Sequence, residues 1–149
     1  MAKILETTEI NAGKDRVWEI ISDLDSEAQY WWGTKEVKNI SKEGNTVERE
    51  IVQNFRNHKI TQRVILRPND EVEVQYLKGL TEGVKLLKLQ SIAENKQKLD
   101  VSWNVHFPGI YKLLGFTIAN HIRKGTVDAL QRIKDVAEGR QITQEQTKI

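Results

Sequence analysis

Residues 98–109 read KLDVSWNVHFPG, and they mark the point where the chain changes from strands to a long helix. Apolar side chains occupy every second position, which is the spacing of a strand with one face on a core and the other in water: Leu99, Val101, Trp103, Val105 and Phe107. Pro108-Gly109 then interrupts the strand. Beyond it, from residue 110 to residue 138, the apolar period becomes helical: Tyr111, Leu114, Ile118, Ile122, Ala129, Ile133 and Val136.

The sequence upstream of this junction predicts a series of short strands. Alternating apolar and polar residues favour strands over residues 3–10, 34–41, 46–55, 59–67, 71–78 and 84–94, with 98–107 as the last. The connections are short and hold turn residues, as in Glu43-Gly44-Asn45 and Pro68-Asn69-Asp70. Parallel strands would need long crossovers, so the sequence predicts an antiparallel meander.

Three helical segments complete the predicted architecture. The first runs over residues 14–24 with Asn11 as its N-cap, a second short turn covers 26–29, and the closing helix covers 110–138 and ends at Gly139. The fold class is therefore α+β, with a curved antiparallel sheet around the closing helix and one or two short helices after the first strand. We expect a single domain over residues 1–139 and a flexible, polar tail over residues 140–149.

This order of elements predicts an internal cavity. A sheet of six or seven twisted strands curls, and one helix is too narrow to fill its trough. The space is then filled by large side chains or left as a pocket. Gly115 and Gly125 interrupt the helix, at about 1 kcal/mol each relative to alanine. They indicate a close backbone approach, a bend or room for a ligand, or simple packing against an aromatic residue such as Trp103.

Composition excludes several classes of protein. The 149 residues carry a net charge of +2 with acids and bases interspersed, which argues against a nucleic-acid binder. The chain has no cysteine, so disulfides and thiolate chemistry are excluded. It shows no signal peptide and no apolar run of the roughly 20 residues that span a bilayer, so we expect a cytoplasmic protein. Its three histidines, His58, His106 and His121, lack the spacing of a metal site. No catalytic or nucleotide-binding motif appears, and we predict no metal and no cofactor.

Arg49 is the first candidate for a role in the cavity. It shares a strand face with Val47, Ile51 and Phe55, which would direct it inward. A buried arginine needs an anionic partner, either a glutamate or a ligand carboxylate. We favour the simpler arrangement, in which Arg49 lies on an edge strand and extends its guanidinium to solvent.

Aromatic residues are the stronger candidates for ligand contacts. Trp31 and Trp32 precede the second strand, and adjacent residues on an extended segment cannot both face inward. Tyr76 and Trp103 each lie on an apolar strand face. Aromatic walls with a few polar tips are typical of small-molecule pockets, although all four residues would also suit a core. Trp18, on the first helix, is expected in the core.

Two stretches of the chain resemble a known superfamily. One is Ile10-Asn11-Ala12 followed by Val17-Trp18, Ile21-Ser22-Asp23-Leu24 and Trp31-Trp32, and the other is residues 101–109 leading into the long helix. Together they resemble START-like proteins, also called the polyketide cyclase/dehydrase and lipid-transport superfamily or the Bet v 1-like helix-grip fold, over residues 3–138. The resemblance implies seven antiparallel strands gripping a helix around a cavity for hydrophobic ligands. On this basis the candidate ligand-binding residues are Trp31, Trp32, Arg49, Ile51, Phe55, Tyr76, Leu87, Leu89, Trp103, Val105, Ile118 and Ile122.

The resemblance leaves three functions open, because a fold does not fix an activity. We favour a binding or carrier protein for an apolar small molecule such as a lipid, isoprenoid or quinone. A cyclase or dehydrase using the same cavity is second, since the sequence names no convincing base and no catalytic residue. A module that contacts a ribosome or another protein is third. The mildly basic closing helix could touch anionic lipid or RNA, but scattered charges of this kind usually form a solvated face.

Overall fold

The computed structural model describes residues 2–79 and 81–142. Seven antiparallel strands form one sheet: β1 (Ala2–Ile10), β2 (Thr34–Glu43), β3 (Thr46–Gln53), β4 (Lys59–Arg67), β5 (Glu71–Lys78), β6 (Glu82–Ala93) and β7 (Lys96–His106). Their order is β1-β7-β6-β5-β4-β3-β2, so the predicted meander is confirmed and β1 is added at its far edge. The predicted strand at residues 84–94 begins two residues earlier, at Glu82.

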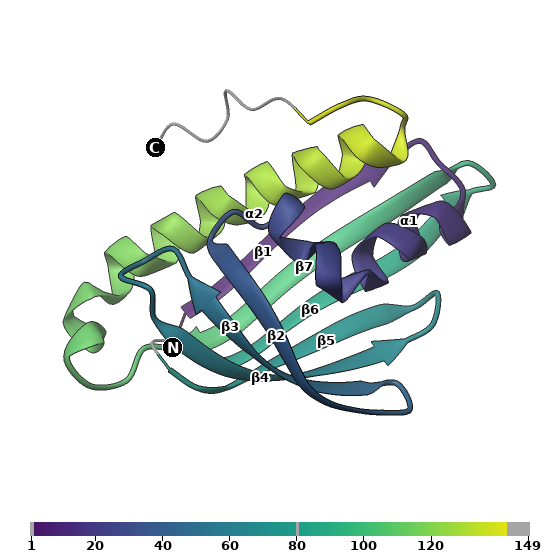
Figure 1. The fold of residues 1–149 in the computed structure, drawn as a ribbon. Helices are drawn as coiled ribbons and strands as arrows, with labels where there is room; N and C mark the ends of the chain where they lie inside the picture. The colour runs from purple at the N-terminus through teal and green to yellow at the C-terminus, as the bar shows by residue number, and fades with distance from the viewer. Residues whose placement is uncertain (1, 80, 143–149) are drawn as a thin grey trace.

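Four helical segments accompany the sheet. They are α1 (Lys14–Ser22), the 3₁₀ turns η1 (Leu24–Gln29) and η2 (Gly109–Leu114), and the long helix α2 (Gly115–Ala137). The sheet bends around α2, which lies along β1 and β7, while α1 and η1 cover the other side of the trough (Figure 1). The predicted helix-grip fold is therefore confirmed.

Two details of the helices differ from the sequence prediction. Gly13, not Asn11, is the N-cap of α1, and no side chain caps that helix. Leu114, expected on the apolar stripe of the closing helix, is 49% exposed because the chain is still a 3₁₀ turn there and does not keep the α-helical period. The stripe is buried only farther along α2, at Ala129, Leu130 and Ile133.

The two helix glycines lie in different surroundings. A Cβ at Gly115 would lie 3.4 Å from the Phe107 ring, so this glycine packs on an aromatic residue, although not on Trp103. A Cβ at Gly125 would have no atom within 4 Å. Close packing therefore accounts for the first glycine only.

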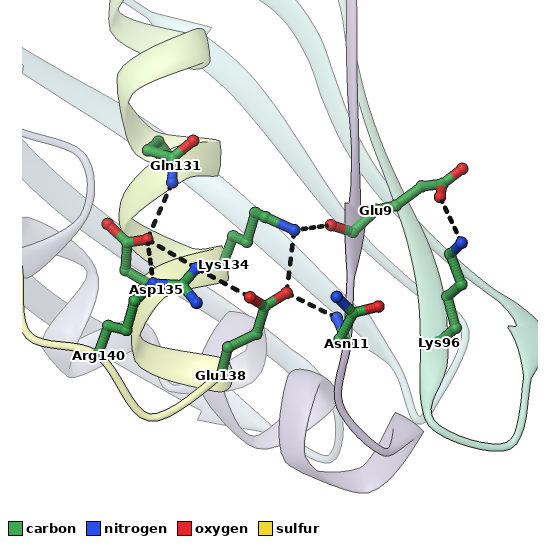
Figure 2. Close-up of polar contacts among 8 residues, drawn as sticks. All are labelled: Glu9, Asn11, Lys96, Gln131, Lys134, Asp135, Glu138 and Arg140. Carbon is green, nitrogen blue, oxygen red and sulfur yellow. Dashed lines mark hydrogen bonds and ion pairs between the residues drawn. The ribbon is translucent and has the colours of Figure 1, made fainter.

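A polar cluster fastens the C-terminal end of α2 to the β1–α1 connection (Figure 2). Glu138 Oε2 accepts hydrogen bonds from the Asn11 backbone N–H at 2.7 Å and from Lys134 Nζ at 2.9 Å. Arg140 binds Glu138 Oε1 at 2.8 Å and Asp135 Oδ1 at 3.0 Å. The end of the helix is thus held in place by charge-assisted hydrogen bonds, which are the stronger kind.

Candidate functional site

A pocket lies between α1, η1, α2 and the inner face of β5 and β6. Its lining is mostly apolar and includes three charged residues: Ile20, Ile21, Asp23, Leu24, Glu27, Tyr30, Trp31, Val72, Val74, Lys85, Leu87 and Ile133. The pocket volume is about 20 Å³. A single water needs a cavity of roughly 10–15 Å³, so the pocket has room for water but not for a lipid.

A buried ion pair lies beside this pocket. Arg49 on β3 is 0% exposed and donates to Glu27 Oε1 at 2.6 Å and to Gln62 Oε1 at 2.8 Å. The expected solvent-directed Arg49 is wrong, because β2 pairs with β3 and β3 is not an edge strand. Burial would raise the pKa of Glu27, but the positive charges of Arg49 and Lys85 outweigh it and hold that pKa below its ordinary value.

Lys85 on β6 is a second buried cation beside the pocket. It is 3% exposed, yet it forms no hydrogen bond or ion pair with any residue that the structure describes. Its Nζ lies 3.8 Å from the centroid of the Trp31 ring and 4.9 Å from that of Trp103. Burial lowers the pKa of Lys85 to about 8, although the negative charge of Glu27 acts in the opposite direction. The ammonium therefore has aromatic faces around it but no close acceptor.

Aromatic rings form the wall next to Lys85. The Trp103 ring lies 6.2 Å from that of Trp31 and 5.6 Å from that of Tyr76, centroid to centroid. Trp103 Nε1 donates to Thr126 Oγ1 on α2 at 3.0 Å, which fixes the indole. Burial, with the nearby charge of Glu27, raises the pKa of Tyr76, so its hydroxyl stays neutral.

The structure brings together only part of the predicted site. Two predicted residues line the pocket, Trp31 and Leu87, and three lie beside the buried charges, Arg49, Tyr76 and Trp103. Five pack in or against the core: Ile51, Leu89, Val105, Ile118 and Ile122. Two lie elsewhere. Trp32 stacks under the Arg132 guanidinium at 3.3 Å, and Phe55 is 44% exposed and stacked on His58.

Sequence reasoning missed the two most informative residues, Glu27 and Lys85. A signal for Lys85 was present, because it shares its strand face with Leu87 and Leu89. No comparable pattern marks Glu27, which reaches the interior from a 3₁₀ turn. Across residues 2–79 and 81–142, no group of three or more potential ligands could hold a metal ion, and no helix is long and apolar enough to cross a membrane.

Comparison with solved structures supports the same fold at low sequence identity. An aromatase/cyclase, Zhui from Streptomyces sp. R1128, superposes with a TM-score of 0.77 at 14% identity, covering 92% of this chain and 93% of that one. TTHA0849 from Thermus thermophilus gives 0.76 at 11% identity, with 89% and 94% covered. A START superfamily protein from Mycobacterium smegmatis gives 0.69 at 14% identity, with 90% and 98% covered.

Sequence comparison identifies the family. No curated protein matches the chain. The family model described as polyketide cyclase / dehydrase and lipid transport, however, matches residues 1–138, which is nearly the whole sequence. With the seven-stranded helix-grip fold, this match shows that the chain belongs to the polyketide cyclase/dehydrase and lipid transport family.

Proposed function

We propose that the chain is a binding or carrier protein for a small apolar molecule, of the lipid, isoprenoid or quinone class, held in the pocket between η1, α2 and the sheet. The observation that carries the proposal is the composition of the pocket wall. Apolar and aromatic side chains surround a small number of charged groups, Asp23, Glu27 and Lys85, and a mostly apolar wall with a few polar groups is typical of ligand pockets. The family description, which includes lipid transport, agrees with it.

Binding requires the pocket to widen, and the start of η1, away from the Glu27–Arg49 ion pair, is the segment best suited to move. η1 is a six-residue 3₁₀ turn in which no residue is fully buried. Segments with little buried surface open at lower free energy than core strands do. Displacement of Leu24 and the start of η1, with Glu27 still bound to Arg49, would admit a ligand against Leu87 and Val74.

Binding of the neutral dye Nile red, displaced by decanol, tests the proposal. We expect saturable fluorescence enhancement with the natural protein and loss of it in Leu87→Trp, which fills the pocket. Leu5→Trp is the matched control, because Leu5 is 65% exposed on the outer face of the sheet. If the natural protein does not bind the dye, or if Leu87→Trp is folded and binds it equally well, the proposal fails.

A cyclase or dehydrase activity is the second candidate, favoured by the lowered pKa of Lys85. A lysine with a pKa of about 8 is partly neutral near physiological pH and could remove a proton from a bound ketone. Elimination of nitrobenzisoxazole, in which a base removes the ring C–H proton as the N–O bond breaks, reports on such a base. We expect a rate that rises with pH through about 8. A rate equal to that of Lys85→Met would exclude this candidate.

A further inference from the structure

We infer that the ligand of this pocket carries a carboxylate head, which binds the ammonium of Lys85; the inference rests on the proposed function. The observation is a lysine that is 3% exposed, lines the pocket and forms no hydrogen bond or ion pair with a described residue, while its Nζ keeps a small accessible area. Such a group has a cost in the free protein, because a buried charge needs compensation by an anion or by hydrogen bonds.

The two acceptors that the structure places nearest to the buried cations are already engaged with Arg49, whereas the Gln62 side-chain nitrogen has no partner. The Glu27 carboxylate binds Arg49 at 2.6 Å, and the Gln62 side-chain oxygen accepts from the same guanidinium at 2.8 Å. Two cations, Arg49 and Lys85, thus share the carboxylate of Glu27, and the other acidic residue of the pocket lining, Asp23, is exposed. A ligand carboxylate would balance the second cation and would supply the acceptors that the Trp31 and Trp103 ring faces do not provide.

A purely structural role for Lys85 explains less. Cation–π contacts with two tryptophans stabilise an ammonium, by about 2 kcal/mol when it is desolvated. If this position served packing alone, an apolar side chain would fill it without the cost of burying a charge. Leu87 and Leu89 fill the neighbouring positions on the same strand face in this way. The lysine is therefore better explained by a partner that comes from outside the chain.

Three probes with the same alkyl chain test the inference: decanoate, methyl decanoate and decanol. Their dissociation constants are measured by calorimetry at pH 7. The ester is the more hydrophobic compound, so burial alone would favour it over the acid. We expect decanoate to bind about tenfold more tightly than the ester, equivalent to about 1.4 kcal/mol. Lys85→Met should abolish this preference and Lys85→Arg should keep most of it. Lys78→Met, a change to an exposed lysine at the end of the neighbouring strand β5, should leave it unchanged.

The outcomes separate the two proposals. Equal affinities for acid and ester in the natural protein overturn the carboxylate inference and leave the proposed function standing. If none of the three probes binds, both fail. If Lys85→Met does not fold, the comparison of acid with ester in the natural protein still decides, together with Lys85→Arg.

A second, independent observation concerns the surface at the start of α2, and we propose that this surface docks on an anionic lipid membrane. Three apolar side chains protrude there: Leu113 is 88% exposed, Phe116 83% and Leu114 49%. The β3–β4 turn lies alongside, since Tyr111 Oη is 3.2 Å from His58 Nε2, and it adds the exposed ring of Phe55. We call these four residues, Phe55, Leu113, Leu114 and Phe116, the η2 surface.

The charges around the η2 surface favour a membrane over a protein partner. Residues 53–59 and 107–127 contain no aspartate or glutamate and five cations: Arg56, Lys59, Lys112, Arg123 and Lys124. Of these five cations, Arg123 alone forms an ion pair with a described residue, Glu6, at 3.6 Å. Protruding leucine and phenylalanine tips flanked by cations match the interfacial layer of an anionic membrane.

Co-sedimentation with vesicles tests this docking. Vesicles of phosphatidylcholine with phosphatidylserine are compared with vesicles of phosphatidylcholine alone. We expect the protein to pellet with the anionic vesicles, to be released by high salt, and to lose about tenfold in affinity in Leu113→Ser with Phe116→Ser. Leu5→Ser, at another exposed apolar position, is the control. The proposal is overturned if the protein does not pellet, if the double variant pellets equally, or if the double variant instead abolishes a dimer seen without lipid.

Discussion

Glu27 and Arg49 are 22 positions apart in the sequence and form a 2.6 Å ion pair inside the protein, with the arginine side chain fully buried and the glutamate side chain 10% exposed. The pair joins η1 to β3. It therefore holds η1 to the strand behind it, next to the segment proposed to open, and it provides the negative charge nearest to Lys85.

Glu27→Gln is expected to destabilise the protein by about 3–5 kcal/mol, because it leaves the Arg49 guanidinium buried without its counter-ion. Urea unfolding at pH 7 measures the loss. Combining the change with Arg49→Met should recover part of it, since an apolar pair replaces an uncompensated charge. Glu19→Gln is the control, because the Glu19 side chain is 74% exposed. A loss below about 1 kcal/mol would mean that the pair behaves like a surface ion pair.

The strands and the closing helix could be predicted from sequence because their burial is periodic. Residues 98–107 alternate on a sheet with one solvated face, and the structure places Leu99, Val101 and Val105 at 0% exposure. Alternation within a strand does not reveal which strands are edges. That is why Arg49 was expected to reach solvent, whereas β2 covers its strand.

The charged part of the site could not be assembled from sequence. Glu27 meets Arg49 only because η1 packs against the sheet, which is a tertiary contact without a periodic signal. Lys85 was different, since the alternation that placed Leu87 and Leu89 inside also applied to it. Lysines are almost never fully buried unless they are paired, so alternation alone does not predict a buried lysine, and a residue that breaks this rule is informative about function.

Thr126→Val is expected to cost about 1–3 kcal/mol, because the Trp103 indole N–H would lose its acceptor in a buried site. The hydroxyl also donates to the Ile122 carbonyl at 2.7 Å, so the change removes two hydrogen bonds while it nearly preserves shape. Thermal unfolding measures the effect. Thr117→Val, an exposed position on the same helix, should change stability by less than about 0.5 kcal/mol. Equal effects at the two positions would assign the loss to helix propensity.

We expect the free energy of unfolding to fall in acid as the Glu138 carboxylate becomes protonated. Burial alone would raise its pKa, but hydrogen bonds from the Asn11 backbone N–H, Lys134 and Arg140 lower it to about 2. The folded carboxylate therefore holds its charge more firmly than the unfolded one, so its contribution is present above pH 4.5 and is lost as pH falls toward 2. Urea unfolding at several pH values should show this decline, and Glu138→Gln should flatten it more than Glu94→Gln, a change in an exposed turn. Parallel curves for the two variants would contradict this assignment.

We expect Lys85 to lower the free energy of unfolding at neutral pH, as a residue that serves binding and not stability would. Burial lowers the pKa of Lys85 from 10.5 to about 8. The titratable and charged groups around it are Glu27 of η1, Arg49 of β3, Tyr76 of β5 and Asp23 of the α1–η1 connection. Between these two pKa values of Lys85 the unfolded chain binds more protons than the folded one, so the free energy of unfolding rises with pH. Lys85→Met should remove that rise and stabilise the protein at pH 7 by roughly 1–3 kcal/mol. Urea unfolding from pH 7 to pH 10 measures both effects. The series stops at pH 10 because the raised pKa of Tyr76 makes the free energy of unfolding fall with pH above that value. Lys78→Met, on β5, provides the baseline for loss of an exposed lysine. If Lys85→Met gives the same pH curve or is less stable than the natural protein, the ammonium is satisfied within the fold and needs no ligand.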